Sequence, residues 1–154
     1  MKKALELLLC ATMMVGLLAG CGSDAQEGGS GDGDTASAKV AYLTPSLDVP
    51  FWRYVRHGVE DELSKSGIEC VTYDSKDDAN TQMSNAQDAI TKQVDAIVIS
   101  PTDSASCVSV LSLAEESGVP VVICDIGTDS GEYVSYISTD NLAGGKAIGE
   151  YIAS

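Results

Sequence analysis

The only Phe and the only Trp of this chain, Phe51 and Trp52, are neighbours at the start of a segment with helical periodicity. Ser46 and Asp48 precede them, in a polar turn that follows the apolar run at residues 40–43. Aromatic rings stack on flat apolar surfaces, and hydroxyls and carboxylates form hydrogen bonds with polar groups of a bound molecule. We therefore predict that this turn lines a binding site for a small molecule with both apolar and polar faces.

Trp52 has a second interpretation. It begins an apolar stripe with Val55, Val59 and Leu63, at intervals of three and four residues. Its side chain is therefore either a ligand contact or the first member of a buried helix face. Phe51 lies about 100° around the helix from that stripe, which makes it the stronger candidate for a ligand contact.

The rest of the chain supplies alternating strand and helix patterns that would position this turn. Apolar runs typical of buried strands occupy residues 40–43, 68–73, 96–100, 119–124 and 133–138. Helical patterns lie between them, with Asp78 or Asn80 as the N-cap of the second helix, and with Gly67 and Gly118 at the ends of the first and third. Right-handed crossovers at this spacing predict an α/β fold with a doubly wound parallel sheet of about five strands in a three-layer αβα arrangement.

Acidic residues follow three of the predicted strands. Asp74, Asp103 and Asp125 lie beyond the second, third and fourth strands. Ligands of open parallel sheets bind outside the carboxyl ends of the strands, so we expect these residues near the turn at residues 44–49. Asp125 is either a ligand-binding carboxylate or a residue that caps its own loop.

The amino terminus is predicted to be a lipoprotein signal peptide, residues 1–20. Lys2 and Lys3 precede an apolar run of thirteen residues, 7–19, which is too short to span a bilayer. The sequence at residues 18–21, Leu-Ala-Gly-Cys, resembles the bacterial lipobox, in which the Cys becomes the lipid-modified first residue. We therefore expect a lipid on Cys21; the alternative is an ordinary secretory signal with Cys21 incidental.

Residues 21–38 are rich in Gly, Ser and Asp, so they predict a flexible acidic linker that tethers the domain to the membrane. The formal net charge of the chain is −14, and removal of residues 1–20, with two lysines and one glutamate, makes it about −15. Nucleic acid is therefore excluded as an expected partner.

Few residues suggest catalysis or metal binding. Cys70, Cys107 and Cys124 lie in or beside apolar runs and are predicted to be small buried residues. The alternative is a single disulfide, Cys70–Cys124 or a similar pairing of these residues. His57 is the only histidine and has no Ser or Cys partner in a nucleophile motif. Glycine-rich nucleotide-binding patterns and an EF-hand-like acidic loop are absent from the sequence. We expect no enzyme activity, no cofactor and no metal.

Five stretches give the chain a family resemblance: DVPFW at residues 48–52, YDS at 73–75, ISPTDS at 99–104, PVVICD at 120–125 and STDNLAGGKAIGEYIA at 138–153. In order and spacing they resemble the ribose-binding branch of the periplasmic-binding-protein-like (type I) sugar receptors. The resemblance implies two lobes that are joined by a hinge and close on a sugar. It further implies that residues 39–138 are the N-terminal lobe, and that residues 139–154 are a hinge crossing and the first helix of an incomplete second lobe.

The resemblance also assigns roles to single residues. Phe51 and Trp52 match the paired aromatics of these receptors, and Asp125 matches their hydroxyl-binding aspartate. Asp140 and Asn141 fall at the hinge crossing and are further candidate ligand contacts. Two departures argue against ribose, because Val49 replaces an asparagine and Ile126 replaces an arginine of the family pattern. A different sugar, a polyol or another small polar molecule is expected.

These observations predict a monomeric substrate-binding protein outside the cytoplasm, anchored to the bacterial membrane through Cys21, that delivers a sugar to the permease of an ABC importer. The first alternative is a ligand-sensing module of the chemoreceptor or lactose-repressor type on the same fold. A flavodoxin-like enzyme or phosphoacceptor domain is a weaker alternative. Thr44-Pro45 and Thr139 stand where a phosphoacceptor would carry an acidic pair and a lysine.

Overall fold

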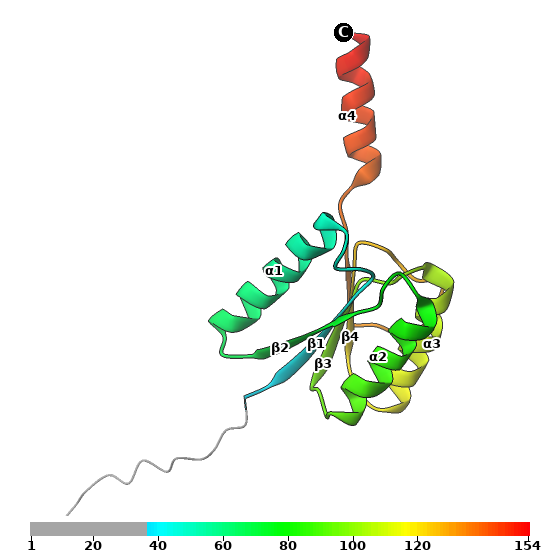
Figure 1. Ribbon diagram of the computed structural model, residues 1–154. Helices are drawn as coiled ribbons and strands as arrows, with labels where there is room; N and C mark the ends of the chain where they lie inside the picture. The colour runs from blue at the N-terminus through cyan, green and yellow to red at the C-terminus, as the bar shows by residue number, and fades with distance from the viewer. Residues whose placement is uncertain (1–36) are drawn as a thin grey trace, which may run out of the picture. The chain divides into compact units, whose positions relative to one another are not determined.

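The computed structural model describes residues 37–154 (Figure 1). The strands are β1 (Lys39–Thr44), β2 (Glu69–Asp74), β3 (Ala96–Ile99), β4 (Val121–Cys124) and β5 (Ser135–Ile137). The helices are α1 (Pro50–Lys65), α2 (Ala79–Thr91), α3 (Ser104–Glu116) and α4 (Asn141–Ala153). All strands are parallel and lie in the order β2-β1-β3-β4-β5, which confirms the predicted doubly wound α/β fold.

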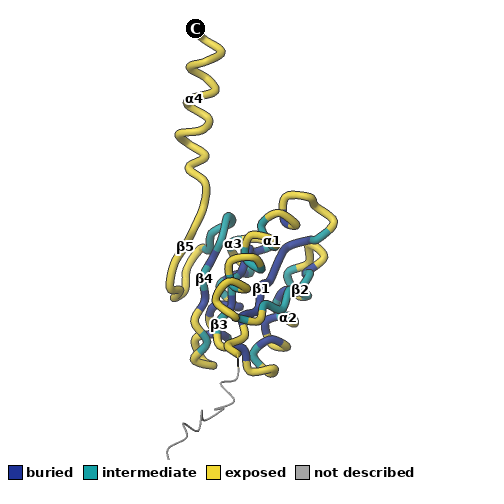
Figure 2. The backbone as a smooth tube through the Cα atoms, turned by 90° about the vertical axis from the view of Figure 1, so that its left-hand side faces the viewer, coloured by how far each residue is buried: buried dark blue, intermediate teal, exposed yellow. Residues whose placement is uncertain are grey.

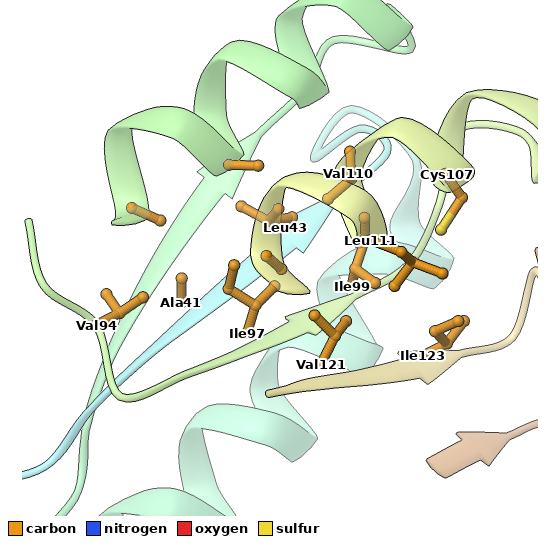
Figure 3. Close-up of a cluster of buried hydrophobic side chains, with 13 residues drawn as sticks. Ala41, Leu43, Val94, Ile97, Ile99, Cys107, Val110, Leu111, Val121 and Ile123 are labelled. Atoms are coloured by element: carbon orange, nitrogen blue, oxygen red, sulfur yellow. The ribbon is translucent and has the colours of Figure 1, made fainter. Parts of the chain in front are cut away.

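The main core lies between the sheet and helices α2 and α3, which cover the same face (Figure 1). Its members are apolar residues that are almost fully buried, and Figure 3 shows them converging from β1, β3, β4 and the two helices. The cluster comprises Ala41, Leu43, Ala86, Ala89, Val94, Ile97, Ile99, Cys107, Val110, Leu111, Ala114, Val121 and Ile123. This packing fixes the central strands and therefore the positions of the loops that follow them.

Helix α1 lies on the opposite face of the sheet (Figure 1). Trp52 is its only buried residue, whereas Val55, Val59 and Leu63 are half-buried. Strand residues alternate between faces, so Val98 and Val122 point to the face opposite the main core, and both remain partly exposed. Trp52 thus begins the inward face of α1, as the periodicity predicted.

The helix ends agree in most cases with the capping residues that the sequence predicts. The Asp78 carboxylate caps α2 by accepting a hydrogen bond from the Thr81 amide at 2.6 Å, so Asp78 and not Asn80 is the N-cap. Asp103 caps α3 in the same way through the Ser106 amide at 2.8 Å. Gly67, which follows α1, has a φ of +68°, a conformation that glycine adopts without steric penalty.

Three predicted strands are shorter in the structure, and the one expected at residues 96–100 loses only its last residue. The strand expected at residues 119–124 begins at Val121, because the Val119 amide closes the end of α3 on the Ala114 carbonyl and Pro120 has no amide hydrogen. The strand expected at residues 133–138 is confined to Ser135–Ile137, the residues that pair with β4.

Helix α4 follows β5 after a short connection. The Asp140 carboxylate caps it by accepting a hydrogen bond from the Ala143 amide at 2.8 Å. Every residue from 129 to 154 is exposed, as Figure 2 shows for α4 and the residues before it. No residue of α4 is buried against another described part of the chain.

The cysteine predictions need correction. Cys107 is buried, and burial raises its pKa to about 11, but Cys70 and Cys124 are only partly buried. All three are free thiols, and the Cys70–Cys124 alternative is wrong. Cys70 lies in β2 and Cys124 in β4, with β1 and β3 between them. Three strand spacings separate them by about 14 Å, whereas a disulfide requires Cα atoms within about 7 Å.

The predicted signal peptide, the lipid-modified Cys21 and nearly all of the linker lie outside the described residues. Within residues 37–154, no helix has the length and apolar character needed to cross a membrane.

Candidate functional site

The turn between β1 and α1 is held by hydrogen bonds to its backbone. The Ser46 hydroxyl, only 2% exposed, accepts a hydrogen bond from the Asp48 amide at 3.3 Å. The Leu47 amide donates to Asp74 Oδ1 at 3.2 Å, and Arg53 donates to the Leu47 carbonyl at 3.1 Å. These contacts leave the Asp48 side chain exposed at the carboxyl end of β1.

Asp74 links the ends of β1 and β2. Its carboxylate also accepts the Lys76 amide at 3.1 Å and forms an ion pair with Lys76 Nζ at 2.5 Å. Partial burial acts to raise the pKa of Asp74, but the hydrogen bonds from Lys76 and Leu47 outweigh it, so the pKa lies below its usual value. The charged Asp74 therefore stabilises the turn that presents the aromatic pair.

The two neighbouring aromatic residues differ in exposure. Phe51 is 50% exposed, whereas Trp52 is 8% exposed. Their ring centroids are 4.8 Å apart at an interplanar angle of 75°, an edge-to-face contact that fixes the Phe51 ring. Val49 is the N-cap of α1 and provides no side-chain hydrogen bond to the first turn of the helix.

A polar cluster that the sequence did not predict lies across the central strands. Tyr42 Oη and Ser100 Oγ are 3.1 Å apart, and Ser100 Oγ lies 2.9 Å from Cys124 Sγ. Thr44 Oγ1 is buried nearby on β1 without a hydrogen-bond partner among the described residues. Burial raises the pKa of both Tyr42 and Cys124. The polar residues at alternate positions of otherwise apolar runs were the available sequence signal.

Asp125 has an unusual backbone conformation. Its φ is +68°, and the Ile126 amide donates to the Cys124 carbonyl at 3.1 Å, which closes a three-residue γ-turn around Asp125. The Asp125 amide donates to the Ile137 carbonyl at 2.8 Å. The Tyr136 hydroxyl donates to the Asp125 carbonyl at 2.7 Å. No hydrogen bond or ion pair from residues 37–154 engages the Asp125 carboxylate, which is therefore available to a ligand.

The structure places the predicted site residues along one edge of the sheet. The carboxyl ends of β1, β2, β4 and β5 meet at this edge because the strands are parallel. Phe51, Asp48 and Asp125 offer side chains that are free of local hydrogen bonds, whereas Ser46 and Asp140 are engaged within their own turns. Asn141 is exposed as the first residue of α4. Asp103, also beyond a strand, is engaged as a helix cap.

A hollow elsewhere on the described chain and the distribution of metal-binding side chains were compared with the site. A hollow of about 290 Å³ between the end of α3 and the start of β4 lies at the amino-terminal edge of the sheet, away from these groups; Val119, Pro120 and Tyr133 are among its lining residues. In residues 37–154, no three His, Cys, Asp or Glu side chains gather in a way that could hold a metal ion.

The sequence is similar to ribose import binding proteins. The ribose import binding protein RbsB of Bacillus subtilis (strain 168) is 30% identical over 155 residues, an alignment that covers 99% of this chain and 50% of that protein. The ribose import binding protein RbsB of Escherichia coli (strain K12) is 32% identical over 118 residues, which cover 77% of this chain and 40% of that protein. The chain thus spans about half, or less, of the length of these relatives.

Solved structures give the same result. The periplasmic ribose ABC transporter structure from Conexibacter woesei DSM 14684 matches with a TM-score of 0.72 and 26% identity, over 77% of this chain and 40% of that one. The Caulobacter myo-inositol binding protein bound to myo-inositol matches with a TM-score of 0.68 and 28% identity, over 74% and 39%. The profile of the periplasmic binding protein domain matches residues 40–154, nearly all of the described chain. This chain is therefore a member of the periplasmic binding protein domain family.

Proposed function

We propose that this chain is part of an extracytoplasmic substrate-binding protein that captures a sugar or a polyol for an ABC importer. The half-exposed Phe51 ring and the unengaged Asp125 carboxylate, on the same edge of the sheet, are the observation that carries the proposal. A sugar has apolar C–H faces and a rim of hydroxyls, and these two side chains match both features. The similar proteins named above are ribose and myo-inositol binding proteins, which supports this ligand class.

We assign the ligand contacts to different chemical roles. Phe51 stacks on the apolar face of the sugar, with Trp52 packed against it from the core side. Asp125 accepts hydrogen bonds from ligand hydroxyls, and Asp48 and Asn141 extend the polar rim. Ser46 and Asp140 support the site by holding the β1–α1 turn and the start of α4. In this proposal the protein binds and delivers its ligand and catalyses no reaction.

The anchoring scheme is also proposed. Residues 1–20 are the signal peptide, Cys21 carries the lipid, and residues 21–38 tether a monomeric domain near the importer's permease.

The division into lobes is part of the same proposal. Residues 39–138 form the N-terminal lobe, and residues 139–154 form the hinge crossing and the first helix of the second lobe. The exposed, apolar character of α4, including Leu142, Tyr151 and Ile152, supports a partner surface for this helix.

A titration followed by NMR tests the ligand proposal. The full chain, isotope-labelled and held in detergent micelles, is titrated with monosaccharides and with myo-inositol, and with neutral amino acids as a control. We expect sugar-dependent shifts that are confined to residues around Phe51 and Asp125, and none with the amino acids. Shifts scattered over the molecule, or none with any sugar or polyol, would contradict the proposed function.

The strength of binding is a further expectation. The chain spans about half of the curated relatives' length, so in this proposal it contributes one wall of the cleft. We therefore expect binding that is too weak to be detected by isothermal titration of the chain alone but that still produces shifts in the NMR titration. Micromolar or tighter affinity for a monosaccharide would show that residues 37–154 form a sufficient site.

A further inference from the structure

Specific contacts keep Asp125 in its unusual backbone conformation. A γ-turn whose central residue has positive φ is rare and strained, and aspartate adopts such a conformation only when surrounding contacts maintain it. In this chain the φ of Asp125 is +68°, and the turn is closed by the 3.1 Å hydrogen bond from the Ile126 amide to the Cys124 carbonyl.

The contacts that maintain the turn come from β5. The Asp125 amide donates to the Ile137 carbonyl at 2.8 Å, and the Tyr136 hydroxyl donates to the Asp125 carbonyl at 2.7 Å. Both backbone polar groups of Asp125 are thus bonded to consecutive residues of one strand. The Tyr136 ring also lies against Gly127, where a built Cβ would be 3.6 Å from the ring.

The two contacts differ in whether a side-chain substitution can remove them. The bond to the Ile137 carbonyl is a backbone contact that continues the pairing of β4 with β5. The bond from Tyr136 depends on one hydroxyl group, which a change to Phe removes without altering the backbone of the strand. Tyr136 is exposed, with 44% of its surface accessible, so loss of its hydroxyl leaves no buried polar group on the tyrosine side.

We propose that Tyr136 is a positioning residue: its hydroxyl holds Asp125 in the γ-turn and so aims the Asp125 carboxylate at the ligand. The ligand-binding part of this inference rests on the proposed function. Because β5 leads within three residues into Asp140 and α4, the same hydrogen bond couples the carboxylate to the crossing segment. A movement of that segment would displace Tyr136 and, through its hydrogen bond, change the conformation of Asp125.

The test compares Tyr136→Phe with a matched control, Tyr133→Phe. Tyr133 is also 44% exposed and lies just before the same strand, and no hydrogen bond of its hydroxyl occurs within residues 37–154. Each change removes one hydroxyl and leaves the ring. The full chain is isotope-labelled in detergent micelles, and the intraresidue amide–Hα nuclear Overhauser effect of Asp125 reports positive φ.

We expect a strong intraresidue effect at Asp125 in the unmodified chain and in Tyr133→Phe, and its loss in Tyr136→Phe. Its persistence in Tyr136→Phe would overturn the positioning role, as would its absence from the unmodified chain. A purely structural role for Tyr136 would lower stability without changing this signal at Asp125 selectively. The stabilities of the two variants are measured in parallel by urea denaturation.

A second arm addresses the ligand. Titration with the sugar or polyol that gives the largest shifts should show about a three- to tenfold weaker affinity in Tyr136→Phe, the usual effect of losing one hydrogen bond, and no change in Tyr133→Phe. Equal affinities in all three proteins would contradict the coupling to the ligand. If the unmodified chain shows no ligand-dependent shifts, the proposed function fails, while the Asp125 signal still decides the role of Tyr136.

Discussion

At the scale of single residues, the candidate site combines one residue with a relaxed backbone and one with a strained backbone. Phe51 lies in the first turn of α1, where an ordinary helical backbone and an edge-to-face contact with Trp52 fix its ring. Asp125 instead has positive φ, which costs about 1 kcal/mol or more for a residue other than glycine. Strain that is retained at a polar, unengaged carboxylate favours a functional role for Asp125.

The strain at Asp125 can be measured. Asp125→Gly should leave the free energy of unfolding unchanged or raise it by up to about 1 kcal/mol, because glycine adopts positive φ without steric penalty. Asp129→Gly, at an exposed aspartate without positive φ, should instead lower it by about 0.5–1 kcal/mol. Urea denaturation of both variants checks this. A loss above about 1 kcal/mol in Asp125→Gly would refute the strain.

Protonation of Asp74 makes the free energy of unfolding depend on pH in the acid range. Because hydrogen bonds from Lys76 and Leu47 hold the pKa of Asp74 below its usual value in the folded protein, the folded state binds this proton less readily than the unfolded chain does. The stabilisation is complete well above the unfolded-state pKa of about 3.9. It declines as the pH falls below about 4 and through the lower folded-state pKa.

The corresponding variant is Asp74→Asn. At neutral pH we expect it to unfold more easily than the unmodified chain by about 1–3 kcal/mol, because hydrogen bonds to a charged acceptor are weakened. The difference should shrink as the pH is lowered below about 4. Unfolding curves at several pH values test this, with the exposed Asp61→Asn as control. A difference that grows on acidification would be the wrong sign and would exclude this account.

At the scale of elements, α1 is the helix whose start is least well stabilised. Helices α2, α3 and α4 each begin with an aspartate that accepts a hydrogen bond from a backbone amide of the first turn. Helix α1 begins at Val49, which provides none, although Pro50 at the first position suits a helix start. The first turn of α1 therefore receives no side-chain hydrogen bond from its N-cap residue.

Val49→Asn should stabilise the protein. Val49 has the extended backbone conformation of an N-cap, with φ −85° and ψ 122°, so an asparagine there can accept a hydrogen bond from an amide of the first turn. We expect the free energy of unfolding to rise by about 1 kcal/mol. Val49→Ala, which adds no acceptor, should not raise it. Equal stabilities of the Asn and Ala variants in urea would disprove the capping argument.

At the scale of the whole molecule, the described residues form one parallel sheet whose two faces are covered unequally. Helices α2 and α3 cover one face, whereas α1 lies on the other (Figure 1). Val98 and Val122, on the face of α1, are partly exposed. Helix α4 also carries exposed apolar side chains.

The proposed membrane anchor is tested at this scale. Cys21→Ser removes the thiol that would carry the lipid, so metabolic labelling with a fatty acid should be lost and the protein should leave the membrane fraction. Cys10→Ser, within the predicted signal peptide, is the matched control and should change neither result. Membrane retention of Cys21→Ser would exclude lipid anchoring through this residue.

The sequence by itself determined the order of the elements, the parallel sheet and most helix ends. Those features depend on short-range rules, such as apolar periodicity and the capping carboxylate of Asp78, which act within a few residues. The sequence also indicated Phe51 and Asp125 as candidate ligand contacts, because each lies in a segment that follows a strand of the expected sheet.

The tertiary structure alone decided the contacts between strands that are distant in the sequence. Tyr42 meets Ser100, 58 residues away, and Tyr136 meets Asp125 only because β5 pairs with β4. The order β2-β1-β3-β4-β5 likewise separates Cys70 from Cys124. Strand order and the positive φ of Asp125 result from packing of the whole sheet, and no local pattern of residues encodes them.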